Sequence, residues 1–164
     1  MGYEGASLPV ADVIADQAMA VSERPSLGLL NAIYGKAHAA AIRGDHATAR
    51  ELDGRGRRIF DGAGSYGQTS DYAVPYWRLN VFRSLLLARL GDEKGAVEAQ
   101  EQASREIPST LPRFATHLEM HKGLMLARSG DRAGGVAYAQ AAMDALPPEK
   151  HSLTLRMLMD EIRA

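Results

Sequence analysis

The stretch LLLARLGDEKGAVEAQEQASREIP, residues 85–108, decides the fold, because the pair Gly91-Asp92 stands between two helical patterns. Glycine directly after the last residue of a helix adopts the left-handed conformation that closes the helix. Aspartate in the next position accepts hydrogen bonds from the exposed N–H groups of a following helix. The pair therefore predicts a tight turn between two antiparallel helices, and Pro108 predicts the end of the second helix.

The same corner occurs twice more in the chain. The stretches HAAAIRGDHATARELDGRGRRIFDG (38–62) and GLMLARSGDRAGGVAYAQAAMDALP (123–147) contain the pairs Gly44-Asp45 and Gly130-Asp131. Small residues also recur at fixed offsets before and after each glycine: Ala37, Ser84, Gly123, Ala49, Ala96, Gly135, Gly56, Ala103 and Ala142. Because small side chains let two helices approach closely, each segment is expected to fold as a close-packed helix hairpin.

This order of small residue, tight turn, small residues and proline resembles the tetratricopeptide repeat, a helix hairpin of 34 residues. The resemblance covers roughly residues 26–147 and implies an all-α fold, in which antiparallel hairpins stack as an α-solenoid. With the amphipathic segments at both ends, we expect about eight helices and no strands. We assign residues 1–164 to a single helical-repeat domain. It comprises a leading helix at 8–24, hairpins at 26–62, 71–108 and 111–147, and a closing helix at 148–164.

The composition is that of an ordinary globular protein, with 46% hydrophobic and 24% charged residues. The formal net charge of −1 leaves no strongly basic surface to bind nucleic acid. The absence of cysteine excludes disulfides and thiolate metal ligands. No apolar run reaches the roughly 18 residues of a membrane span. Acidic residues near the N-terminus are not typical of a secretory leader, so we expect a cytoplasmic protein.

Residues 62–67, GAGSYG, fit the spacing G-x-G-x-x-G of dinucleotide-binding loops. That site requires a strand before the glycines and a helix after them, whose N-terminus holds the pyrophosphate. Here a helical pattern precedes the loop, and an irregular segment leads to Pro75 at the start of the next helix. We interpret the segment as a connection between hairpins and expect neither a nucleotide nor another cofactor.

The histidines of the sequence HLEMH, His117 and His121, lie one turn apart on one helix face, a spacing that can bind zinc. Metalloproteases use the order His-Glu-x-x-His, whereas Glu119 stands between the two histidines here. A third ligand would have to come from elsewhere, such as His38 or His151, and no pattern requires one. No nucleophile elbow or paired-carboxylate pattern is present. We therefore expect no metal site and no catalysis.

Tetratricopeptide-like hairpins line a concave groove with their first helices, so the resemblance also implies a set of ligand-binding residues. These positions, with Trp77 beside them, combine aromatic, apolar and cationic groups: Asn31, Tyr34, His38, Trp77, Arg78, Val81, Leu85, His117, Met120, Leu124 and Arg128. Such a mixture suits a peptide or a small amphiphile better than a bare phosphate. The alternative is that Trp77 and Phe82 belong to the core and that Arg78 and Arg128 are solvated charges.

Residues 111–164 are similar to the C-terminal part of helix-turn-helix regulators of actinobacteria, which join a DNA-binding domain to a tetratricopeptide-like sensor. The similarity implies that the chain is the non-catalytic, effector-binding sensor half of a transcriptional regulator. No helix-turn-helix pattern with basic recognition residues lies in residues 1–60, so contact with DNA would come from another part of the protein. Two alternatives remain open. One is a constitutive scaffold or homodimerisation module, and the other is a metal-dependent hydrolase that uses His117 and His121.

Overall fold

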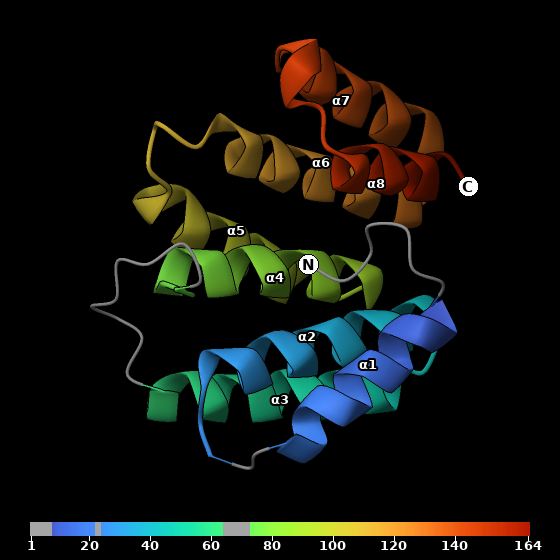
Figure 1. The fold of residues 1–164 in the computed structure, drawn as a ribbon. Helices are drawn as coiled ribbons and strands as arrows, with labels where there is room; N and C mark the ends of the chain where they lie inside the picture. Colours follow the sequence, from blue (N-terminus) through green and yellow to red (C-terminus); the bar gives the residue numbers. More distant parts are fainter. Residues whose placement is uncertain (1–7, 22–23, 64–72) are drawn as a thin grey trace. The chain divides into compact units, whose positions relative to one another are not determined.

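The computed structural model describes residues 8–21, 24–63 and 73–164, and these residues form eight α-helices and no strand (Figure 1). The all-helical class expected from the sequence is thereby confirmed. The helices are α1 (Leu8–Val21), α2 (Leu27–Ile42), α3 (His46–Ala63), α4 (Tyr76–Arg89), α5 (Glu93–Glu106), α6 (Pro112–Arg128), α7 (Arg132–Asp144) and α8 (Leu153–Arg163). A 3₁₀ turn, Pro148–Lys150, precedes α8, so the closing helix begins later than the sequence predicts.

The chain divides into two compact units, Met1–Tyr76 and Trp77–Ala164. The assignment of residues 1–164 to a single helical-repeat domain stays a prediction. Each unit is described by itself. Most of the glycine-rich stretch 62–67 lies outside the described residues, and only its first two residues belong to them, at the end of α3.

In the first unit, α2 packs against both α1 and α3. The buried Tyr34 of α2 donates a hydrogen bond from its hydroxyl to Asp53 Oδ1 of α3 at 2.9 Å. Its ring lies so close to Gly56 that any side chain at Gly56 would collide with it. The absence of a side chain at this position therefore lets Tyr34 fill the interface between the two helices.

In the second unit, α6 packs against α5 and α7, and α8 packs against both α6 and α7. One core cluster joins three helices, because Val81 of α4, Ala103 of α5 and Leu118 of α6 are buried together. Trp77, Ile107 and Phe114 are partly buried and pack against this cluster. The helices of this unit thus pack as neighbouring pairs that share a core.

All three Gly-Asp corners have the geometry that the sequence predicts. The glycines are the only described residues with positive φ, at 82°, 70° and 108° for Gly44, Gly91 and Gly130. The aspartate N–H groups donate back to helix carbonyls five residues earlier, at 2.9–3.0 Å: Asp45 to Ala40, Asp92 to Leu87, and Asp131 to Leu126. The aspartate side chains then accept hydrogen bonds from the next helix, from the N–H groups of Thr48, Gly95 and Gly134. Each corner thus closes one helix and caps the next.

The recurring small residues lie where helices approach, and all of them except Ala142 are buried. The approach is closest between α6 and α7. A Cβ atom added to Gly135 would lie 2.4 Å from the Gly123 carbonyl oxygen, and one added to Gly123 would lie 2.8 Å from the Gly135 oxygen. In the other two hairpins the corresponding positions hold alanine or serine. The third hairpin therefore packs with its two backbones almost in contact.

Candidate binding site

The predicted groove draws on residues of both units. In the first unit, the side chains of Tyr34 and His38 are buried. Asn31 is partly exposed, and its side-chain amide donates a hydrogen bond to the Leu27 carbonyl of its own helix at 2.9 Å. In this conformation, Tyr34 and His38 serve the packing of α2 rather than an open surface.

In the second unit, the predicted groove residues Val81 and Met120 are buried, and so is Phe82. Trp77 is partly exposed, and its ring meets Phe114 edge to face with centroids 5.0 Å apart. The Arg78 guanidinium lies over the same Phe114 ring, 5.7 Å from its centroid. Burial lowers the pKa of Arg78. Trp77 and Arg78 therefore form the edge of a core cluster.

His117 and His121 of α6 lie with ring centroids 6.1 Å apart. Burial, and next the charge of Arg113, lower the pKa of His117 to about 4, so its ring is neutral at neutral pH. His121 pairs through Nδ1 with the Ser84 hydroxyl at 2.9 Å. Among the described residues, no group of three or more histidine, aspartate or glutamate side chains could hold a metal ion.

The Ser84–His121 pair has the residue types of a nucleophile and its base. Both side chains lie in the core, with Ser84 0% and His121 1% exposed. A substrate atom has no access to the hydroxyl in this conformation. The pair instead satisfies two buried polar groups between α4 and α6.

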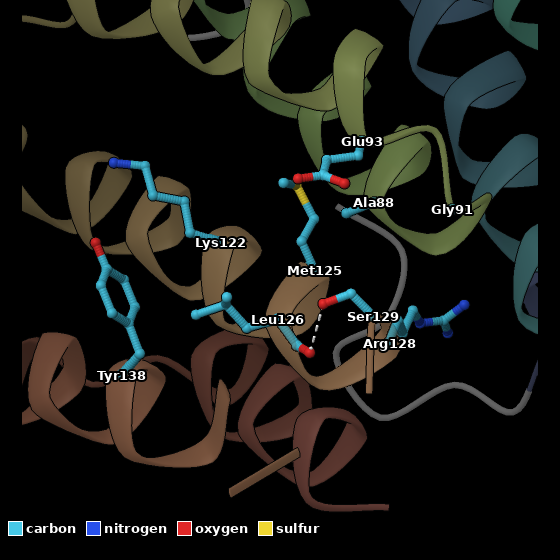
Figure 2. A pocket seen from close by; sticks show the side chains of 9 residues that line it. All are labelled: Ala88, Gly91, Glu93, Lys122, Met125, Leu126, Arg128, Ser129 and Tyr138. Carbon is cyan, nitrogen blue, oxygen red and sulfur yellow. Dashed lines mark hydrogen bonds between the residues drawn. The ribbon is translucent and has the colours of Figure 1, made fainter. Parts of the chain in front are cut away.

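A surface pocket of about 340 Å³ lies on the second unit (Figure 2). Its lining comes from the α4–α5 corner, from the second half of α6 and from α7: Ala88, Gly91, Glu93, Lys122, Met125, Leu126, Arg128, Ser129 and Tyr138. Figure 2 shows Lys122 and Tyr138 on one side and Arg128 on the other, with Met125 and Leu126 between them. The pocket thus combines an apolar middle with charged ends.

At one end of the pocket, three side chains form a hydrogen-bonded network. Lys122 Nζ donates to Glu119 Oε1 at 2.8 Å, and the Tyr138 hydroxyl donates to Glu119 Oε2 at 2.5 Å. Burial acts to raise the pKa of Glu119, but the hydrogen bonds from Lys122 and Tyr138 outweigh it and lower that pKa. The bond to Glu119 raises the pKa of Tyr138. At this end of the pocket, the Glu119 carboxylate is therefore held by two hydrogen bonds, and the Lys122 ammonium has further N–H donors that can bind a ligand.

At the other end, Arg128 joins α6 to the neighbouring helices. Its guanidinium donates to the Arg89 carbonyl oxygen at 2.5 Å and lies 3.5 Å from Glu161 Oε1. Arg89 itself binds Glu161 through Nε and Nη2, at 2.9 and 2.6 Å. These contacts fix the position of Arg128 at the rim of the pocket.

Arg128 alone among the predicted ligand-binding residues lines this pocket. The structure brings it together with Lys122, Met125 and Tyr138, which the sequence did not single out. The one sequence pattern that points to this pocket is the i, i+3 spacing of Glu119 and Lys122, which predicts an ion pair between them. Such pairs are common on exposed helix faces, so the pattern does not by itself indicate a binding site.

No family model matches the chain, and neither does any curated protein or solved structure. Within the described ranges, none of the helices is long and apolar enough to cross a membrane.

Proposed function

We propose that the chain is a non-catalytic binding module made of tetratricopeptide-like hairpins, and that it forms the effector-sensing part of a transcriptional regulator. Two features support the tetratricopeptide-like assignment. The first is the same glycine-aspartate corner in three successive hairpins, and the second is the row of small residues between paired helices.

The pocket on the second unit is the observation that carries the binding role. Its apolar middle, made by Ala88, Met125 and Leu126, suits an apolar side chain or a short alkyl group. Lys122 at one end can bind a carboxylate, and Glu93 offers an acceptor to an amide or a cation. A short peptide segment or a small amphiphile has this combination of groups.

The position of the pocket suggests how occupancy is transmitted. Its lining includes the α4–α5 corner as well as α6 and α7, so an occupant contacts two successive hairpins at once. A ligand that binds better to one packing angle of these hairpins shifts the population toward that angle. In the proposed regulator, this shift is what a DNA-binding part reads.

The test uses two probes, sodium dodecanoate as an amphiphile and an array of ten-residue peptides of mixed sequence. Binding is measured by calorimetry and by NMR shifts of the Met125 methyl group and the Tyr138 ring. Leu126→Glu places a charge in the apolar middle, and we expect at least about tenfold weaker binding. Leu153→Glu on α8 is the matched control, since Leu153 is 41% and Leu126 37% exposed.

Wild-type and Leu153→Glu proteins should bind the same probes with equal affinity. If no probe shifts the Met125 and Tyr138 signals, or if Leu126→Glu binds as well as the control, the pocket is not the binding site.

A further inference from the structure

Helix α1 has an apolar face that is open to solvent. Four branched side chains on it, Val10, Val13, Ile14 and Val21, are 49%, 55%, 56% and 85% exposed. Gln17 and Ala18, which lie on the same face at helical spacing, are exposed as well. The face therefore runs over the length of the helix, with one amide as its only polar group.

The charges of α1 lie away from this face. Its two acidic residues form ion pairs within the first unit, Asp12 with Arg43 at 2.9 Å and Asp16 with Lys36. Helix α1 contains no lysine or arginine. Surface-active helices that lie on membranes carry basic residues on their polar face, so α1 lacks the charges that attract an anionic lipid surface.

We infer that this face binds the same face of a second copy of the chain, with the two α1 helices antiparallel. The positions 10, 13, 14, 17, 18 and 21 are symmetric about their midpoint. An antiparallel pair therefore sets Val10 against Val21, Val13 against Ala18, and Ile14 against Gln17 of the other copy. A large side chain then meets a small one at the second of these contacts, which favours close packing.

A second copy fits better than an unrelated charged partner, because the face is uncharged. In a twofold contact both copies contribute the same face, so a face with charges of one sign would repel itself. One helix per copy is a small contact compared with the roughly 800 Å² per partner of a stable interface. The dimer is therefore weak and depends on protein concentration.

The experiment measures the mass of the full chain by analytical ultracentrifugation from about 10 µM to about 1 mM, a range suited to weak association. The wild type should shift from monomer to dimer. Val13→Lys and Ala18→Glu, each alone, should raise the dissociation constant at least about tenfold. The double variant should restore dimerisation, because each lysine then meets a glutamate of the other copy.

This rescue cannot arise within one chain, since residues five apart do not face each other on a helix. Val97→Lys on α5, where Val97 is 39% exposed, is the control and should leave the mass unchanged. Circular dichroism confirms that each variant keeps its helices. A wild type that stays monomeric at the highest concentration overturns the proposal, as does a dimer that the single variants leave intact. If both single variants dissociate and the double variant fails to recover, the antiparallel arrangement is wrong.

Discussion

Three glycines carry the most demanding backbone conformation in the described chain, and Gly91 is the clearest of them. Its φ is 70°, and an added Cβ atom would meet nothing within 4 Å. A substitution there is thus penalised by the backbone alone. We expect Gly91→Ala to lower the free energy of unfolding by about 1–2 kcal/mol, as measured by urea denaturation.

Gly91→Asn provides the comparison, because asparagine enters the left-handed region more readily than alanine. It should cost less than Gly91→Ala although it is the larger side chain. An equal or greater loss for asparagine would mean that space, and not φ, makes glycine necessary at this corner.

At the residue scale, the corners could be predicted because glycine and aspartate act through their immediate neighbours. The candidate site could not be predicted in the same way. Glu119 has a lysine one turn away in the sequence, but its second partner, Tyr138, comes from the next helix. Which side chain of α7 reaches α6 depends on how the two helices cross, and no local pattern records that crossing.

Among the elements, α6 and α7 form the closest helix pair. A Cβ atom at Gly135 would lie 2.4 Å from the Gly123 carbonyl oxygen and 2.6 Å from the Ala127 nitrogen, both backbone atoms that yield only if a helix moves. We expect Gly135→Ala to destabilise the protein by about 1–3 kcal/mol in urea denaturation, the cost of overpacking.

Gly35→Ala in α2 is the matched control, because it makes the same substitution inside a helix. Nothing lies within 4 Å of a Cβ atom added to Gly35. Alanine should therefore stabilise the helix by about 0.5–1 kcal/mol. If Gly135→Ala is neutral or stabilising as well, the helices do not approach as closely as described.

Many predicted groove residues lie in the core because the helices that carry them are buried on more than one side. Helices α2, α4 and α6 each bury residues around much of their circumference. Tyr34, Val81 and Met120 are apolar or aromatic, and the periodicity of such residues cannot tell a groove from a core. The ligand-binding role assigned to them remains a prediction for this chain.

At the scale of the second unit, one carboxylate joins three helices that are distant in sequence. Glu161 of α8 accepts hydrogen bonds from the buried Arg89 of α4 and lies near Arg128 of α6. The sequence predicts a closing helix at this end, because the apolar residues of 148–164 follow helical spacing. It does not reveal the ion pair, whose partners are 72 positions apart.

Because Arg89 is buried, the loss of the Glu161 charge beside it should cost far more than the loss of a surface ion pair. We expect Glu161→Gln to lower the free energy of unfolding by roughly 3 kcal/mol in urea denaturation. Arg89→Met should cost a similar amount. The double variant Arg89→Met with Glu161→Leu removes both members of the buried pair, and the only charge that loses a partner is the exposed Arg128 guanidinium. It should therefore be more stable than the sum of the single losses implies. Strict additivity of the two losses would show that Arg89 and Glu161 contribute independently, and that the ion pair does not hold α8 against α4.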